Sequence, residues 1–180
     1  QGQVTAIPER PFTDEVSDFE DFVAANPTLL GQGLEIVARQ VSSSAGRIDL
    51  LAIDKSLEHA QIVIVELKNT AADVDVLLQV LRYASWVESN QDSVRLLLSQ
   101  NHFDLPDVDI HPRLVVVAPH IRDSLVVLSQ YVRSFEFDLI EMGRFESNEE
   151  TFVITSRRSP TGFTPAGVSR REEWGWDRYK

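Results

Sequence analysis

The stretch IVIVELKN at residues 62–69 constrains the fold of this chain more than any other. Successive side chains of a β-strand point to opposite faces, so this run presents two sets of residues. One face carries Ile62, Ile64, Glu66 and Lys68, and the other carries Val63, Val65 and Leu67. Both faces are largely apolar, which is typical of a central strand in a sheet that is covered on both sides.

The two charges on this strand allow two interpretations. In the first, Glu66 and Lys68 lie at the wet end of the strand, where neighbours or solvent neutralise them, as is common for charge pairs. In the second, they belong to a functional site, because a charge on a buried strand is costly unless it is paired, solvated or bound to a metal.

Composition predicts a single soluble domain. With 180 residues, 43% of them hydrophobic and 25% charged, the chain is long enough for a full core. It has no cysteine, which excludes disulfides and thiolate metal sites and is consistent with a reducing compartment. No apolar stretch approaches the roughly 20 residues of a membrane span and no leader pattern opens the chain, so we expect a cytoplasmic location and no membrane partner. The sequence does not begin with Met, which leaves open whether it is a fragment of a longer protein.

The net charge of −11 argues against a protein that simply coats nucleic acid, which would present a basic surface to phosphates. Residues 156–180 are an exception, because basic residues outnumber acidic ones there. We expect this tail to supply phosphate contacts that the body lacks, so its deletion after Ser156 should weaken binding and flatten the salt dependence. Trp174 and Trp176 are expected to pack on the core or on a partner, with stacking on single-stranded bases as the alternative.

Periodicity predicts alternating strands and helices. A first helix begins at Thr13 and ends near Asn26, because Pro27 disfavours helix in the residue before it. The strands that follow, at 33–41, 46–54 and 60–68, form an antiparallel meander. A helix over 70–87 has Thr70 as its N-cap, with Asp73 three residues later. The remaining elements are a helix or strand at 93–100, a strand at 113–119, a helix at 122–134 and strands at 135–142 and 151–156.

Strand register connects the second and third predicted strands. If the strand that ends at Ile53 turns back into Ile62 as a hairpin, Asp49 falls opposite Glu66 on the same face. Directly paired residues have Cβ atoms about 4.5–5.5 Å apart, and two carboxylates that close repel unless a proton or a cation lies between them. A hard divalent cation, Mg²⁺ or Mn²⁺, suits such a pair, and Lys68 would stand beside it.

These motifs together resemble the PD-(D/E)xK nuclease superfamily, in which an acidic residue on one strand precedes an E-x-K triplet on the next. Here Ile48-Asp49 stands in place of the proline and aspartate, and Glu66-Leu67-Lys68 is the triplet. The sequence QVLRY is similar to the Q-x-x-x-Y motif of the RecB-type branch. Upstream, FEDFVAANPTLLG resembles helix one of the NucS-like (DUF91-type) endonucleases.

The resemblance covers roughly residues 15–141 and implies an α/β fold of the restriction-endonuclease type, with a mixed central sheet flanked by helices. It predicts a polar lead at 1–14, a nuclease domain at 15–155 and a basic Pro/Gly-containing tail at 156–180. Such nucleases normally have a separate DNA-binding domain before the catalytic one, which this sequence lacks.

The resemblance also implies a metal site. Asp49 and Glu66 would bind Mg²⁺ or Mn²⁺ together with the backbone carbonyl of Leu67. Lys68 would orient or deprotonate the attacking water. Glu20, the acid of helix one, would reach the metal through a water and face the sheet. We expect these side chains to converge in one cleft.

Three further residues have implied or alternative roles. Gln79 would hold the metal-bound water or a phosphate, and Tyr83, one helical turn later, would contact DNA or support Gln79. An ordinary helix face is the alternative for both. Glu15 competes with Glu20 for the role of the acid in helix one.

The implied function is metal-dependent hydrolysis of phosphodiester bonds in DNA, in repair, recombination or defence. A second reading is a nuclease-fold module that binds nucleic acid or protein and has lost activity, as the acidic charge suggests. A third is a defence or restriction nuclease whose specificity lies in another domain or subunit. RNA as substrate and a homodimer as assembly both stay open.

Overall fold

The computed structural model describes residues 7–147 and 150–159. Within them, one six-stranded sheet has its strands in chain order, β1 to β6. The strands are β1 (Leu34–Ser43), β2 (Gly46–Asp54), β3 (Gln61–Leu67), β4 (Asp109–Ala118), β5 (Phe137–Ser147) and β6 (Glu150–Arg157). The helical elements are η1 (Glu15–Glu20), α1 (Asp21–Ala25), η2 (Pro27–Leu29), α2 (Val74–Ser89), α3 (Gln91–Gln100) and α4 (Asp123–Ser129).

The sheet is mixed. Strands β1, β2 and β3 pair antiparallel, β3 to β5 pair parallel, and β6 returns antiparallel to β5. The predicted meander and the α/β class with a mixed central sheet are therefore confirmed. Strand β3 lies inside the sheet, between β2 and β4, as its two apolar faces predicted.

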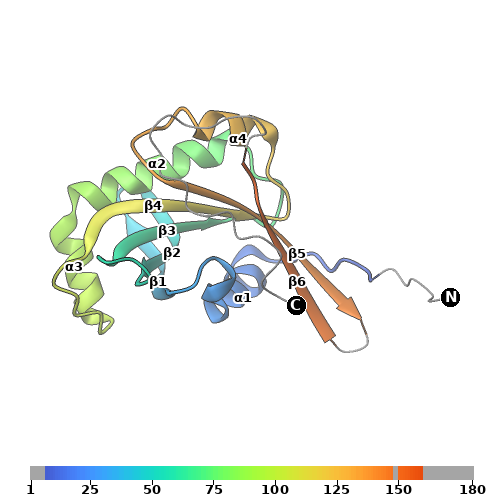
Figure 1. Ribbon diagram of the computed structural model, residues 1–180, viewed down its shortest axis with the longest axis horizontal. Helices are drawn as coiled ribbons and strands as arrows, with labels where there is room; N and C mark the ends of the chain where they lie inside the picture. Colours follow the sequence, from blue (N-terminus) through green and yellow to red (C-terminus); the bar gives the residue numbers. More distant parts are fainter. Residues whose placement is uncertain (1–6, 148–149, 160–180) are drawn as a thin grey trace.

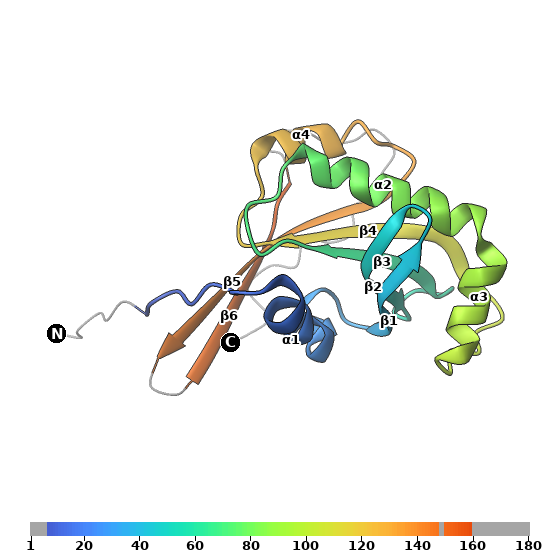
Figure 2. The ribbon, with the colours of Figure 1, turned by 180° about the vertical axis from the view of Figure 1, so that it is seen from behind.

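Helices cover both faces of the sheet. Figures 1 and 2 show α2 and α4 on one side and α1 on the other. Two core clusters correspond to these sides: Ile62 and Ile64 pack in the cluster that contains the buried face of α2, whereas Val63 and Val65 pack in the cluster that contains Phe19 of η1. Strand β3 therefore carries Glu66 toward the α2 side by the same alternation. No helix of the described residues is long and apolar enough to cross a membrane.

The long helix α2 begins later than predicted. Its N-cap is Asp73, whose carboxylate accepts from the Val74 N–H at 2.8 Å, so the expected cap at Thr70 is wrong. The reason is a strand-like contact just before the helix. The Ala72 N–H donates to the His120 carbonyl at 2.9 Å and Ala72 forms a parallel bridge with Ile121, which keeps this segment extended.

Other element boundaries also differ from the predictions. The segment left open as helix or strand is the helix α3, and α4 ends at Ser129 instead of Ser134. Beyond α4, the Ser134 carbonyl lies 2.7 Å from the His111 ring nitrogen Nε2 on β4, at the entry to β5. The first helix ends at Ala25, with Asn26 as C-cap, as Pro27 predicted.

The ends of the described chain join the sheet. Near the start, Arg10 N–H donates to the Arg144 carbonyl at 2.7 Å and Glu9 bridges Phe145. At the other end, β6 continues to Arg157, which pairs with a carboxylate of β5, and Arg158 forms an ion pair with Asp123 at 2.6 Å. These first two arginines of the predicted basic tail therefore serve the fold. Its remaining basic residues, with Trp174 and Trp176, lie outside the described residues.

Candidate active site

The hairpin of β2 and β3 brings two carboxylates to neighbouring strands. The ladder pairs Ile53 with Ile62 and continues step by step to Leu50 with Val65, which is the predicted register. The ladder ends at that pair, one step short of the predicted pairing of Asp49 with Glu66. There the Asp49 Oδ2 accepts from the Leu67 N–H at 2.9 Å, so the side chain of Asp49 lies against the end of β3.

Glu66 is fully buried, unlike the wet strand end of the first interpretation. Its Oε1 accepts from the Lys68 ammonium at 2.6 Å, while Oε2 has no hydrogen-bond partner among the described residues. Burial raises the pKa of Glu66 to about 8, and the charge of Asp49 adds to this shift. Burial also raises the pKa of Asp49. A buried oxygen without a partner, beside a second carboxylate, is a place for a proton or a cation.

Lys68 supplies a fixed positive charge at the edge of this pair. Its side chain is 22% exposed, and its ammonium lies 2.6 Å from Glu66 and 3.8 Å from Glu15. Burial acts to lower the pKa of Lys68, but the hydrogen bond to Glu66 and the surrounding carboxylates outweigh it and raise the pKa. Lys68 therefore keeps its proton near neutral pH, which favours orienting a water or a phosphate over deprotonating one.

Glu20 faces the sheet as predicted, since it is buried while Asp21 is exposed. Both oxygens of Glu20 already have donors: Arg39 Nε donates at 2.8 Å, and the side-chain amide of Gln40 donates to the other. The same Gln40 amide lies 3.5 Å from Asp49 Oδ1. The structure thus connects Glu20 to Asp49 through Gln40.

Glu15, the competing acid, contacts the site directly. Besides the ion pair with Lys68, its carboxylate accepts from the Asn69 N–H at 3.3 Å. Glu15 therefore ties η1 to the segment that follows β3. The two acids of helix one have different neighbours: Glu15 lies next to Lys68, whereas Glu20 supports the Asp49 side.

Gln79 and Tyr83 lie one turn apart on α2 and contact each other. The Gln79 amide donates to the Tyr83 hydroxyl at 2.8 Å, and this hydroxyl donates to the Arg47 carbonyl on β2 at 2.7 Å. Burial raises the pKa of Tyr83, and the charges of Glu66 and Asp49 add to the shift. Tyr83 thereby supports Gln79 and fastens α2 to the strand that carries Asp49. A role for either residue toward water, phosphate or DNA stays a prediction.

Sequence reasoning missed Arg39 and Gln40. In ARQV they read as ordinary residues of an alternating strand. A usable signal existed, because β1 and β2 pair Arg39 with Leu50 and Val41 with Ile48. The pairing argument that placed Glu66 opposite Asp49 would also have placed Gln40 opposite Asp49, on the other neighbouring strand.

The donor set at this site is compatible with a hard divalent cation. Carboxylate and carbonyl oxygens are the ligands that Mg²⁺ and Mn²⁺ prefer. Glu66 has an unpartnered buried oxygen, Oε2, and the charge of Asp49 acts on the same carboxyl. Among the described residues, no three His, Asp or Glu side chains form a ready-made cation cluster. Asp49, Glu66 and the Leu67 carbonyl are therefore the groups that would hold the cation, with water completing its shell.

The metal-free protein should lose stability as the pH rises from about 4.5 to about 8. Between these values folded Glu66 holds a proton that the unfolded chain has lost, so the free energy of unfolding falls with rising pH, by on the order of 2–5 kcal/mol. The raised pKa of Asp49 acts in the same direction. Thermal melts in chelator at stepped pH measure this fall. Glu66→Gln should flatten the curve, and a wild-type curve that rises across the window would contradict the assignment.

Comparison with known proteins gives one matching family and two solved structures of similar fold. The family described as the endonuclease NucS C-terminal domain matches residues 15–104, which is half of the chain and contains every candidate site residue. The structure of an EndoMS–dsDNA2 complex is similar in fold, with a TM-score of 0.50 and 19% identity over 77% of this chain and 49% of that chain. A repair endonuclease from Pyrococcus abyssi has a TM-score of 0.49 and 20% identity over 73% of this chain and 49% of that chain. The present chain spans about half the length of each of these two.

Proposed function

Because the chain belongs to the family of the endonuclease NucS C-terminal domain, we propose that it is a nuclease domain that hydrolyses phosphodiester bonds in DNA with Mg²⁺ or Mn²⁺. The observation that carries the proposal is the half-buried Asp49 next to the fully buried Glu66, with the Lys68 ammonium beside them. An ordinary structural ion pair would need neither the second carboxylate nor an unpartnered buried oxygen on Glu66.

The residues divide the chemistry among them. A divalent cation bound by Asp49 and Glu66 would neutralise phosphate charge and make a water more acidic. The Lys68 ammonium would stabilise the charge that develops on the attacked phosphate or orient the water. Gln79, held by Tyr83, would donate its amide toward the same water or phosphate. Glu15 would keep Lys68 in place.

DNA is the substrate we propose first. The family is that of an endonuclease, and one protein of similar fold was solved with double-stranded DNA. The carboxylates of this acidic chain repel phosphates, so binding must depend on cations that they do not neutralise. Among the described residues four arginines form no ion pair: Arg47, Arg82, Arg95 and Arg133.

Two of these arginines flank the site. Arg47 contributes the carbonyl that holds Tyr83, and Arg82 precedes Tyr83 on α2; both side chains are exposed. We expect Arg47→Ala and Arg82→Ala each to weaken DNA binding and to reduce the slope of log affinity against log salt by about 1, the loss of one phosphate contact. Fluorescence anisotropy with labelled DNA in chelator, over a series of salt concentrations, measures both quantities.

Arg95→Ala and Arg133→Ala are the matched controls, because these unpaired arginines lie on α3 and after α4. Equal losses of slope in all four variants would mean that the charge acts only through the net charge of the protein, and that Arg47 and Arg82 make no special contact.

A digestion panel tests the proposed activity. Plasmid, single-stranded and branched DNA, with RNA of matched sequence, would each be incubated with Mg²⁺, Mn²⁺ or chelator. Metal-dependent cleavage of any DNA form is the expected result. Metal binding or nucleic-acid binding without cleavage of any substrate would favour the inactive binding module instead, which the acidic composition already suggests.

The wider setting is also a proposal. We place the domain in DNA repair, with recombination or defence as alternatives, and in the cytoplasm, since a chain without cysteine suits a reducing compartment. Since the chain spans about half of the solved chains of similar fold, DNA recognition is expected to need a further domain, a second subunit or a homodimer. Size-exclusion chromatography with light scattering, with and without DNA, distinguishes these assemblies.

A further inference from the structure

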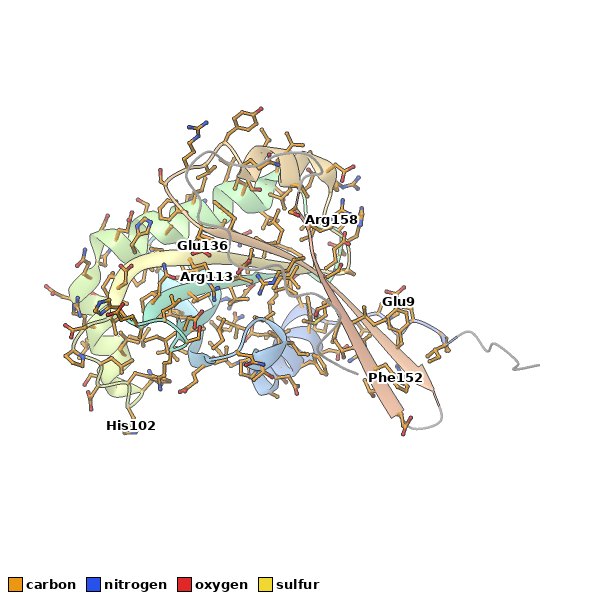
Figure 3. The ribbon with its side chains drawn as sticks, viewed as in Figure 1. Glu9, His102, Arg113, Glu136, Phe152 and Arg158 are labelled. Carbon is orange, nitrogen blue, oxygen red and sulfur yellow. The ribbon has the colours of Figure 1, made fainter. Side chains whose placement is uncertain are left out.

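Gln40 has an unusual backbone for a strand residue. Its φ is 51°, in the left-handed region that residues other than glycine rarely adopt. Among the described residues His102, with φ 66°, is the only other non-glycine with positive φ. His102 lies at the outer tip beyond α3 (Figure 3), whereas Gln40 lies in the middle of the β1–β2 hairpin. Such conformations persist where the surrounding structure enforces them, and they cluster at functional sites.

Register places this residue beside the carboxylate pair. The β1–β2 ladder pairs Arg39 with Leu50 and Val41 with Ile48, so Gln40 lies opposite Asp49. Strand β2 also departs from strict alternation here, because Ile48 and Leu50 pack in different core clusters although they are two residues apart. Both strands are therefore irregular at the level of Asp49.

The side chain of Gln40 joins two acids. Its amide nitrogen donates to Glu20 and lies 3.5 Å from Asp49 Oδ1. On the far side, Glu20 accepts from Arg39 Nε at 2.8 Å. An amide has two N–H groups and no charge, so it can lie between two carboxylates and donate to both, which a third carboxylate could not do.

We propose that Gln40 is a positioning residue for the metal site, and that its left-handed backbone aims the amide so that buried Glu20 fixes the orientation of Asp49. This rests on the proposed function, in which Asp49 is a metal ligand. Asp49 then has one donor on each oxygen, Gln40 on Oδ1 and the Leu67 N–H on Oδ2. Ligands held in this way lose less freedom when a cation binds, and residues behind a ligand commonly affect metal affinity by about 10–100-fold.

Gln40→Gly tests the proposal, because glycine accepts the left-handed backbone and removes the whole side chain with its amide. The measured quantity is the affinity for Mg²⁺ and Mn²⁺ alone, from calorimetry and from the metal-induced shift in melting temperature. We expect the affinity to fall by about 10–100-fold. The melting temperature without metal is measured in parallel, because relief of the backbone strain and loss of the donor to buried Glu20 act on it in opposite directions. In cleavage assays the half-saturating Mg²⁺ concentration should rise by a similar factor with the KM for DNA unchanged. His102→Gly makes the same backbone change away from the site and should leave both quantities unchanged.

Gln40→Asn is the second variant, because asparagine also tolerates the left-handed region and its amide is one methylene too short. Gln40→Asn should also lower the affinity for Mg²⁺ and Mn²⁺. It keeps the proposal testable if Gln40→Gly proves poorly folded. If both Gln40 variants bound Mg²⁺ and Mn²⁺ as tightly as His102→Gly does, the proposal would be overturned. The proposed nuclease function would not be affected by that result. A wild-type protein that binds neither Mg²⁺ nor Mn²⁺ would overturn the proposed function first, and the role of Gln40 with it.

Discussion

Glu66→Gln is expected to abolish the metal-induced stabilisation and the nuclease activity together. Glutamine keeps the shape of the side chain but removes a ligand charge next to Asp49, and the cation then loses half of its carboxylate set. The loss of cleavage should exceed about 100-fold, the upper end for a residue that only supports a ligand. Wild type at a metal concentration of 100 times Kd should gain about 2.7 kcal/mol, measurable as a rise in melting temperature, and the variant should gain nothing.

The folded variant should be at least as stable as wild type without metal. Near neutral pH Glu66 is buried with a pKa of about 8, so glutamine replaces a side chain that is already largely uncharged. Glu35→Gln is the control, since Glu35 forms an exposed ion pair with Lys55 and should leave the metal response intact. Retained cleavage in Glu66→Gln, with Glu35→Gln also active, would remove Glu66 from the chemistry.

Lys68→Met should separate metal binding from catalysis. The substitution deletes the ammonium that lies 2.6 Å from Glu66 and competes with a cation for that carboxylate. Metal-induced stabilisation should therefore persist or grow, while kcat falls by about 10²–10³-fold, as for the loss of a group that stabilises transition-state charge. Melting curves with and without Mg²⁺, together with single-turnover cleavage, measure the two effects separately.

Lys55→Met is the matched control, because Lys55 also pairs with a glutamate at 2.8 Å, but both side chains of that pair are exposed. It should change neither the metal response nor cleavage. If Lys68→Met lost metal binding and cleavage in parallel, Lys68 would be a structural support for the site and not a participant in the reaction.

The sheet and the carboxylate pair were readable from the sequence because both depend on local rules. Alternation along 62–68 and the hairpin between Ile53 and Ile62 determine which side chains meet, and the structure has that register. The buried position of Glu20 followed equally from helical spacing. Membership of the nuclease family agrees with the motifs that carried the resemblance.

Contacts between distant segments were not readable in this way. The N-cap of α2 is Asp73 and not the predicted Thr70, because the Ala72 N–H donates to the carbonyl of His120, which is distant in the sequence. The left-handed backbone of Gln40 has no counterpart in a hydrophobic pattern, since the polar side chain alone looks like any exposed strand residue. The different neighbours of Glu15 and Glu20, Lys68 and Gln40, likewise depend on which strand residues approach η1.

The candidate site residues all come from one unbroken stretch of the chain, residues 15–83, and the described elements after it contribute none of them. Strand β4 touches it through backbone pairing, as where the Lys68 N–H donates to the Val117 carbonyl at 2.9 Å. We therefore expect substitutions after Tyr83 to change how firmly β3 is held while leaving the candidate site residues themselves in place. A recombination event at the boundary between α2 and α3 would pass on the candidate site residues as a single block.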